Sequence, residues 1–322
     1  MLPKVSVIIT SYNQKAYLIE AIESVLNQTL KPFEIIIADD CSTDSSQEVI
    51  QEYARTYPDL IRPFCHERNL GIPRNKSFAL EQVQGDLVTY LDGDDRFLPR
   101  KLELEAETLK NQPEAQIVYS NVHYIDAHGQ RIGLWIDRNT MPPTGYVFRE
   151  TFAREFPKKT LFRNEIIYYQ CLKDTGFYDS QFAIYEDWEL RIRLTKKFKI
   201  AYCPEPLSEY RLHQGGISKS VALRHLDAMK RVYDKNSSLL SDLPEHERVT
   251  IEEKLSNIFS RFAHKVSEEE IAKGNRRHAL KYLLESWRYD PKNFDLSLPV
   301  QLILPQRLYS QLKMVYYNLR GT

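Results

Sequence analysis

The sequence predicts an α/β protein: a mainly parallel, Rossmann-like sheet with helices on both faces, followed by a C-terminal helical region. From Val5 to Ser120, short β-branched runs alternate with longer amphipathic segments, the pattern of right-handed βαβ crossovers. From about Ser220 the chain is charged and helix-forming, with few strand signals. Its 322 residues suit a main domain and a smaller one, because single cores stop growing near roughly 250–300 residues.

The alternation also places each element before residue 120. "STDSSQEV" supplies Ser and Asp caps for the second helix, and Pro99 stands where a first helical turn tolerates proline. Ligands of such sheets bind beyond the carboxyl ends of the strands, so functional residues are expected there. The expected strands are 5–9, 33–38, 60–65, 86–91 and 115–120, and the expected helices are 15–28, 45–57, 73–84 and 99–111.

After Ser120 the alternation stops. Residues 121–135 predict a hairpin around His128 and Gly129, and residues 138–148, with two prolines and a glycine, predict a loop. Further on, one segment has Ala279, Leu283 and Ser286 at the spacing of the second helix of a tetratricopeptide repeat, which indicates a helical hairpin. The stretch 298–322 is apolar and basic, and either docks on the core or lies on an anionic membrane surface.

Composition excludes some classes of function. Lys plus Arg and Asp plus Glu both total 44, so no basic excess indicates a nucleic-acid partner. The four cysteines are widely spaced without a CxxC pair, which indicates reduced thiols. The apolar run near the N-terminus is too short for a signal peptide or a membrane span. We therefore expect a cytoplasmic protein.

Polar residues follow the first two expected strands, in "TSYN" (10–13) and "ADDCSTD" (38–44). If these strands are parallel neighbours, both segments lie at one edge of the sheet. An Asp there could accept the imide N–H of uracil or thymine or bond ribose hydroxyls, whereas the alternative is a helix-capping turn. Capping accounts for Asp44 or Ser42 but not for two acids at the strand end, which favours nucleotide binding by Asp40.

The segment "NLGIPRNKS" (69–77) combines a turn at Gly71 with a helix start at Pro73. Arg74 then lies in the first helical turn, where a cation is unfavourable unless it meets an anion. A nucleotide phosphate or base would satisfy it. A solvated surface arginine is the alternative.

The stretch "TYLDGDDRF" (89–97) gathers Asp92, Asp94 and Asp95 around Gly93 directly after an apolar run. Carboxylates this close repel one another unless a cation or hydrogen-bond donors lie among them. Mg²⁺ and Mn²⁺ take carboxylate oxygens together with substrate phosphates. The spaced acids of a calcium loop are absent, and no Cys or His adjoins the stretch to suggest zinc.

These segments, with "YEDWELRIRL" (185–194) and "YRLHQGGIS" (210–218), closely resemble in their order the family 2 glycosyltransferases of the GT-A fold. The resemblance covers roughly residues 3 to 220. It implies a domain 1–220, with a nucleotide-binding half 1–120 and an acceptor-binding half 121–220, and a separate helical region 221–322. A dinucleotide-dependent oxidoreductase is excluded, because "TSYNQK" replaces the glycine-rich turn after the first strand.

The resemblance also implies roles for individual residues. On the nucleotide side, Thr10 and Asp40 bind the base, Arg74 approaches the nucleotide, and Asp92 meets the ribose side; Tyr12 is a further substrate-binding candidate. Asp94 holds a Mn²⁺ or Mg²⁺ ion that bridges the diphosphate. His213, in a lid with Ser218, is a second metal candidate, and a structural histidine is the alternative. Asp95 either supports the turn or caps the helix near Pro99.

On the acceptor side, the resemblance implies that Asp187 is the catalytic base, with Glu186 beside it as a substrate-binding residue. From the residues alone, "EDWEL" is equally an acid-rich first helical turn. Trp188 stacks on a sugar or is buried in the core. We thus expect an inverting, metal-dependent transfer from a nucleoside diphosphate sugar, UDP- or dTDP-linked, to a hydroxyl of a glycan or lipid-linked acceptor in cell-surface polysaccharide biosynthesis. A non-catalytic sugar-nucleotide or glycan-binding module is the alternative.

Overall fold

The computed structural model describes residues 3–137, 139–213 and 221–292, with residues 308, 310, 311 and 314. Contacts divide the chain into two units, Met1–Gly216 and Ile217–Thr322. The lid residue Ser218 lies outside the described residues, and so does nearly all of the stretch 298–322, for which a core-docking or membrane role is predicted.

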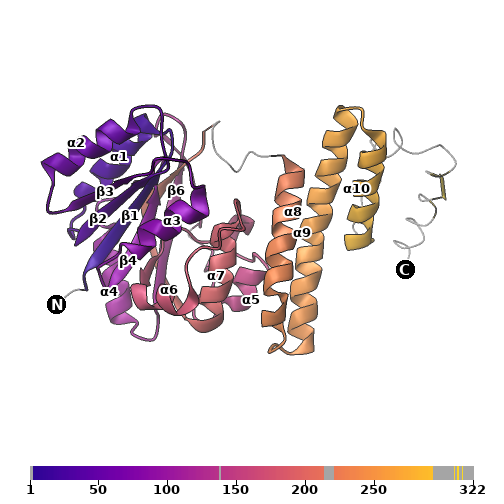
Figure 1. Ribbon diagram of the computed structural model, residues 1–322. Coiled ribbons are helices and arrows are strands. Elements are labelled where there is room, and N and C mark those ends of the chain that lie inside the picture. The colour runs from indigo at the N-terminus through magenta and orange to yellow at the C-terminus, as the bar shows by residue number, and fades with distance from the viewer. Residues whose placement is uncertain are drawn as a thin grey trace. The chain divides into compact units, whose positions relative to one another are not determined.

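The first unit contains a nine-stranded sheet in the order β3-β2-β1-β4-β8-β6-β9-β5, with β7 beside β6 (Figure 1). Strand β1 pairs in parallel with β2 and β4, and β2 pairs in parallel with β3, which confirms the parallel half of the sheet. Beyond β4 the sheet is mixed, because β8 is antiparallel to both β4 and β6 whereas β6 and β9 are parallel. The strands are β1 Val5–Ser11, β2 Glu34–Asp39, β3 Ile61–Cys65, β4 Leu87–Asp92, β5 Arg96–Phe97, β6 Ile117–Ile125, β7 Arg131–Leu134, β8 Ile166–Tyr168 and β9 Ile200–Arg211.

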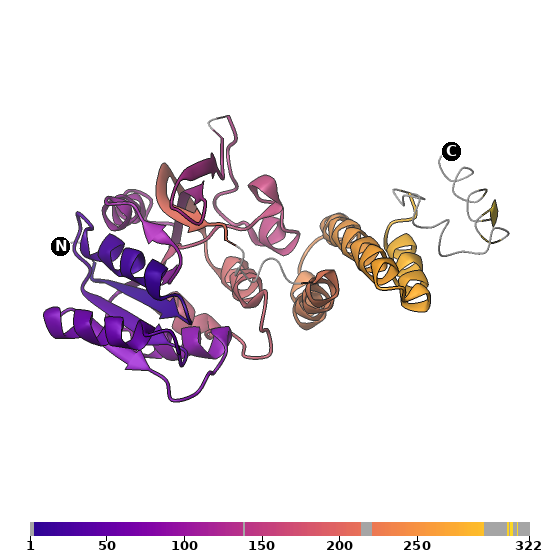
Figure 2. The same ribbon diagram turned by 90° about the horizontal axis from the view of Figure 1, so that it is seen from above.

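Helices cover both faces of this sheet (Figures 1 and 2), so β1 and β2 are buried along nearly their whole length, as parallel strands usually are. Helix α1 buries Leu18, Ala21, Ile22 and Val25, one stripe of a 3.6-residue period. The helices of this unit are α1 Lys15–Leu26, α2 Ser46–Thr56, α3 Ile72–Glu81, α4 Lys101–Asn111, α5 Phe148–Phe152, α6 Tyr169–Thr175 and α7 Glu186–Lys197.

The expected elements up to residue 120 are all present, with boundaries displaced by up to three residues at helix ends. The largest difference is β6, which continues past Ser120 to Ile125. Strand β9 pairs with β6 along this extension, and no local sequence pattern predicts that pairing. The hairpin around His128 and Gly129 is confirmed: it joins β6 to β7, and Gly129 has a φ of +79°. All four cysteines are free thiols.

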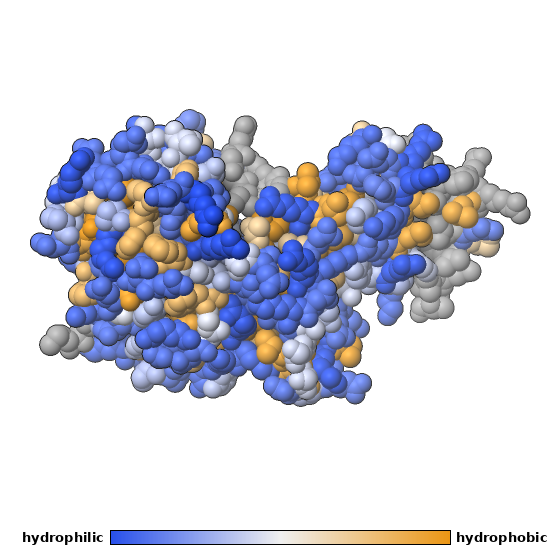
Figure 3. Space-filling model, in the orientation of Figure 1, coloured by the Kyte–Doolittle hydropathy of each residue, from blue (hydrophilic) through white to orange (hydrophobic). Residues whose placement is uncertain are grey.

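The second unit is helical in its described part, as expected. Helices α8 Ala222–Asn236, α9 Glu245–Ala272 and α10 Arg276–Tyr289 lie side by side (Figure 2). The pair α9 and α10 forms the expected hairpin, with Ala279, Leu283 and Ser286 buried and Ser286 hydrogen-bonded to Ser260. On the face in Figure 3, the residues over these helices are mainly hydrophilic. None of the described helices is both long and apolar enough to cross a bilayer.

Candidate active site

The ends of β1, β2 and β4 bring several of the predicted residues to one edge of the sheet. Thr10 stands opposite Asp92 in the β1–β4 register, and its Oγ1 donates to Asp92 Oδ1 at 3.5 Å. The Asp40 amide donates to the Ser11 carbonyl at 2.9 Å, which holds the end of β2 against β1. Tyr12 directly follows β1 and is 49% exposed, so its ring is available to a ligand.

The two acids after β2 have different partners. Asp39 accepts from the Ser42 amide at 2.8 Å, in the manner of a turn cap. Asp40 is only 4% exposed, and its two carboxylate oxygens accept from the amides of Leu70 at 2.6 Å and Gly71 at 2.9 Å. Asp44, one of the two expected caps, accepts from the Ser46 amide in the first turn of α2 at 3.1 Å, and Asp39 caps the turn before it. Asp40 anchors the loop before α3. The remaining lone pairs of its carboxylate can still accept hydrogen bonds from a nucleotide.

Helix α3 begins after Gly71, whose φ of +84° favours glycine. Arg74 is exposed in the first turn and takes part in none of the described ion pairs. Asn75 faces inward and donates to the Ala38 carbonyl at 3.0 Å, which holds α3 against β2. The structure therefore leaves the Arg74 guanidinium open to an anion or to solvent, as both predictions for it require.

Lys76 is a site residue that the sequence analysis missed. Its buried Nζ lies 3.2 Å from Asp92 Oδ1 and 3.3 Å from Glu186 Oε1. Burial disfavours the charge, but Asp92 and Glu186 outweigh it and raise the pKa of Lys76 well above its usual value. One signal could have revealed it: Lys76 shares the buried face of α3 with Ala79 and Leu80, at i+3 and i+4.

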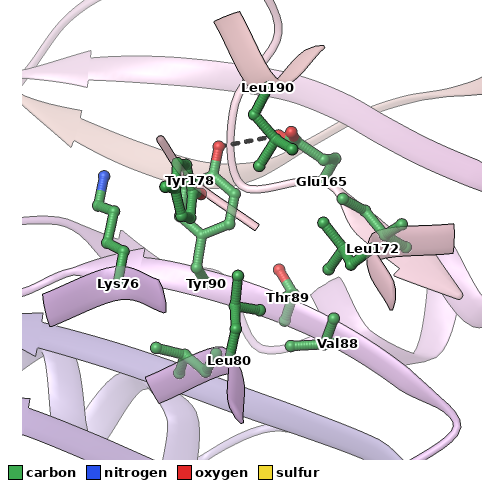
Figure 4. A pocket seen from close by; sticks show the side chains of 11 residues that line it. Lys76, Leu80, Val88, Thr89, Tyr90, Glu165, Leu172, Tyr178 and Leu190 are labelled. Atoms are coloured by element: carbon green, nitrogen blue, oxygen red, sulfur yellow. Dashed lines mark hydrogen bonds between the residues drawn. The ribbon is translucent and has the colours of Figure 1, made fainter. Parts of the chain in front are cut away.

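A small cavity of about 20 Å³ adjoins Lys76, with Tyr90, Glu165 and Tyr178 among its lining residues (Figure 4). This volume holds about one water molecule. The Tyr90 hydroxyl donates to Glu165 Oε2 at 3.0 Å, the contact dashed in Figure 4. Glu165 in turn accepts from Arg191 Nε at 2.9 Å. The cavity is too small for a sugar. Its lining residues therefore hold neighbouring side chains in place and do not bind a substrate there.

The turn after β4 is tightly packed against β1. The Gly93 amide donates to the Thr10 carbonyl at 2.9 Å, and a Cβ at position 93 would lie 2.9 Å from that same oxygen. Asp94 Oδ2 lies 2.9 Å from His213 Nε2. Burial and the charge of Asp92 raise the pKa of Asp94, and His213 partly offsets them. The two predicted metal candidates are thus in direct contact.

Asp95 is a buried residue that stabilises this turn. It is 1% exposed, and its Oδ1 accepts from the Arg211 amide at 2.8 Å, so it ties the turn to the end of β9. Burial, Asp94 and Asp92 raise its pKa well above the usual value. Of the two roles expected for Asp95, the structure shows the supporting one. Helix α4 has no side-chain cap at Arg100.

The acid pair at the start of α7 has widely separated pKa values. Burial raises the pKa of Glu186 to about 7, against the opposing charge of Lys76. Burial would also raise that of Asp187, but Arg191, Lys76 and Arg154 lower it to about 2. The Asp187 side chain is 41% exposed, and its Oδ2 lies 2.5 Å from Arg191 Nη1. Asp187 is therefore the ionised, accessible member of the pair, whereas Glu186 lies buried against Lys76.

These residues lie in a chain with recognisable relatives. The family model described as Glycosyl transferase family 2 matches residues 6–173, just over half of the 322 residues. The chain belongs to glycosyl transferase family 2. The expected glycosyltransferase family and GT-A fold are thereby confirmed.

Two curated relatives of this family 2 member illustrate the range of similarity. The uncharacterized protein Rv1520 of Mycobacterium tuberculosis is 29% identical over 214 residues, which cover 66% of this chain and 60% of Rv1520. The putative teichuronic acid biosynthesis glycosyltransferase TuaG of Bacillus subtilis is 40% identical over 105 residues, 33% of this chain and 41% of TuaG. The matched part of this chain thus spans about three-fifths or less of the length of either relative.

Among solved structures, TarS 1-349 of S. aureus is similar to this chain with a TM-score of 0.65 and 20% identity, over 98% of this chain and 88% of that one. Further crystal structures of TarS hold UDP and UDP-GlcNAc. At this level of identity the similarity establishes the fold.

The structure corrects one substrate-binding prediction for this family 2 member. Trp188 has 0% exposure, and its Nε1 donates to the Thr151 carbonyl at 2.9 Å. Its ring therefore has no open face for stacking on a sugar. The side chain instead fixes α7 to α5, as the core alternative expects.

The site also bears on the expected metal. No cluster of three or more His, Cys, Asp or Glu side chains that could hold an ion occurs among the described residues. The contacting pair of Asp94 and His213 is nevertheless chemically suited to Mn²⁺, which accepts carboxylate and imidazole ligands and fills its remaining positions with phosphate oxygens and water. A cation would also relieve the repulsion between Asp92 and Asp94 that raises the pKa of Asp94.

Proposed function

We propose that this glycosyltransferase is an inverting enzyme that transfers a sugar from a UDP- or dTDP-linked donor to a hydroxyl of a glycan or lipid-linked acceptor. One observation supports the proposal most directly. Asp187, ionised and partly exposed, lies at the start of α7, and its neighbour Glu186 is joined through Lys76 to Asp92 on the donor side. A base and a donor site are thus held in one rigid arrangement.

In this mechanism Asp187 accepts the proton of the acceptor hydroxyl while the oxygen forms a bond to the anomeric carbon and the diphosphate leaves from the opposite face. Its low pKa keeps it ionised at neutral pH, ready to accept that proton. Arg191 orients the carboxylate through its 2.5 Å contact with Oδ2. Thr10, Tyr12, Asp40, Arg74 and Asp92 bind the nucleotide half of the donor.

Asp94 and His213 would hold a Mn²⁺ or Mg²⁺ ion. When bound, such an ion neutralises charge on the departing diphosphate as a Lewis acid. His213 also packs against the Tyr17 ring, with 5.3 Å between centroids, so its imidazole is kept beside Asp94. The family's use of nucleotide sugars and the donor set of these two residues support the assignment.

Two relatives support the finer parts of the proposal. The structures of TarS with UDP and UDP-GlcNAc favour a UDP-linked donor. The name of TuaG, a putative teichuronic acid biosynthesis enzyme, favours a role in cell-surface polysaccharide synthesis. Such a role implies work in the cytoplasm, at or near the inner face of the membrane. A non-catalytic sugar-nucleotide or glycan-binding module is the second candidate, although the presence of Asp187 and Asp94 argues for the enzyme.

A thermal-shift panel of nucleoside diphosphates and their sugars, each with and without Mn²⁺, tests the proposal. A ligand at about 100 times its dissociation constant stabilises the folded protein by roughly 2.7 kcal/mol, which is easily measured. We expect shifts with UDP or dTDP ligands that increase with Mn²⁺. A transfer or hydrolysis assay on the best donor then separates the enzyme from the binding module. A full panel without any shift would contradict the proposal.

A further inference from the structure

Arg154 is a cation beside the candidate base Asp187. The proposed mechanism gives Arg154 no contact with a substrate. This arginine lies two residues after the end of α5, and its backbone has a left-handed φ of +56°. Its guanidinium carbon lies 5.1 Å from the Tyr185 ring centroid and 5.0 Å from that of Trp188. Because Trp188 is itself fixed to Thr151 by a hydrogen bond, the arginine stands on a rigid aromatic support.

Two other cations near Asp187 already have acidic partners. Lys76 contacts Asp92 and Glu186, and Arg191 contacts Glu165 and Asp187. No carboxylate among the described residues forms an ion pair with Arg154, and its guanidinium forms no hydrogen bond within this part of the chain.

Arg154 is also only partly exposed, and burial lowers its pKa from the usual value. Charges withdrawn from water in proteins are normally paired. The protein therefore keeps a partly desolvated guanidinium that has aromatic contacts but no ion-pair partner among the described residues.

The position of Arg154 indicates what that partner is. Its guanidinium packs on the ring of Trp188, the residue that follows Asp187, and its charge contributes to the lowered pKa of that carboxylate. Asp187 is the group that would receive the acceptor hydroxyl proton. A guanidinium that rests on aromatic faces still presents its N–H edge, which matches the two oxygens of a phosphate or a carboxylate.

We propose that Arg154 binds a phosphate or carboxylate group of a substrate, next to the hydroxyl that Asp187 activates. This inference rests on the proposed function and narrows its substrate class to anionic ones. Two sources share the chemistry: an acceptor that carries phosphate or uronate groups, or a donor whose sugar is a uronate. A purely internal role, in which Arg154 only keeps Asp187 ionised, predicts no anion binding.

Titrations followed by saturation-transfer NMR on the full chain test the proposal. The probes are glycerol 3-phosphate and glucuronate, with glycerol and glucose as neutral counterparts, each with and without UDP and Mn²⁺. We expect the anions to bind more tightly than the neutral probes. In Arg154→Gln the anion affinity should fall at least about tenfold, the usual effect of losing a charge-assisted hydrogen bond, and Arg154→Lys should restore part of it.

Arg55→Gln is the matched control. It removes the same charge from an exposed arginine in the last turn of α2, at the opposite edge of the sheet, and should leave anion binding unchanged. Circular dichroism of each variant checks that it is folded. If Arg154→Gln binds the anions as well as the unaltered chain does, or if the anions bind no better than the neutral probes, the proposal is wrong.

A second arm separates the two sources by comparing UDP-glucuronate with UDP-glucose. A donor anion predicts tighter binding of UDP-glucuronate that Arg154→Gln abolishes. An acceptor anion predicts no such preference, with glycerol 3-phosphate or glucuronate binding alongside UDP-glucose. If no UDP compound binds, the proposed donor is wrong, while the titrations without nucleotide still decide the role of Arg154.

Discussion

The ammonium of Lys76 lies 3.3 Å from the carboxylate of Glu186, and this contact joins α3 to the first turn of α7 across 110 residues of sequence. The same ammonium lies 3.2 Å from Asp92 at the end of β4. One buried cation therefore connects the strand that would bind the donor with the helix that carries the candidate base.

Lys76→Met should destabilise the protein, because it leaves the buried Glu186 carboxylate without its cation. Breaking a buried ion pair from one side costs roughly 3–5 kcal/mol. Urea denaturation measures the loss. Lys110→Met, at an exposed position in the last turn of α4, is the control and should change stability by no more than about 0.5 kcal/mol. Equal losses in the two variants would show that the Lys76 contacts contribute nothing specific.

Stability should fall with rising pH because of Glu186. Its pKa rises on folding from the usual 4.5 to about 7, so the folded state binds this proton more tightly than the unfolded chain does. The resulting stabilisation is complete below 4.5 and is lost as the pH rises through about 7. Glu186→Gln should flatten this dependence of stability on pH. Urea denaturation midpoints measured between pH 4.5 and about 7 give the comparison. Asp187, with a pKa lowered to about 2, affects stability only at more acidic pH. If the stability of Glu186→Gln depends on pH as strongly as that of the unaltered chain, Glu186 is not the group responsible.

Asp187→Asn should abolish transfer and leave donor binding largely intact. The amide cannot take the acceptor proton, and losing a general base typically costs about 10²–10⁴ in rate. Turnover and the donor dissociation constant, measured on the same preparation, separate these effects. Equal losses of binding and turnover would mean that Asp187 holds the donor and is not the base.

Asp94→Ala should remove the Mn²⁺ dependence of nucleotide binding. The carboxylate that contacts His213 at 2.9 Å is then absent, and imidazole alone is a weak site for a hard cation. Calorimetric titration of UDP with and without Mn²⁺ gives the comparison. Asp59→Ala, in an exposed turn before β3, is the control for loss of one acid. A metal dependence that survives in Asp94→Ala would place the ion elsewhere.

Gly93→Ala should destabilise the turn after β4. The added Cβ would lie 2.9 Å from the Thr10 carbonyl oxygen, a backbone atom that already accepts from the Gly93 amide. Overpacking of this kind costs typically about 1–3 kcal/mol, measurable by denaturation, and should also weaken nucleotide binding. Gly133→Ala, whose Cβ would meet its nearest neighbour at an ordinary 3.6 Å, should be nearly neutral. No difference between the two variants would contradict the close approach.

Sequence reasoning predicted the neighbours in the candidate site because its residues lie at the ends of strands. Parallel neighbours end at one edge, so Thr10, Asp40 and Asp92 could be brought together from the strand pattern alone. The contact between Asp94 and His213, 119 residues apart, followed only from the resemblance in motif order. Their role as metal ligands stays a prediction.

The supporting contacts were less predictable, since each depends on a partner far along the chain. Arg191 stands four residues after Asp187, a spacing that indicates a helical ion pair. Nothing local indicates that Arg191 also binds Glu165, which lies outside any helix 26 residues earlier. Trp188 was ambiguous for the same reason, because only the packing of α5 on α7 decides that it is buried.

The two hydrogen bonds that Asp40 accepts from Leu70 and Gly71 have a consequence for donor preference. Any substitution of Asp40 would release the loop that leads into α3, and with it Arg74, before it altered recognition of a base. Variants at position 40 therefore confound loop order with specificity. A change of nucleotide, whether engineered or evolved, is more accessible through the exposed side chains of Tyr12 and Arg74, which no part of the described backbone depends on.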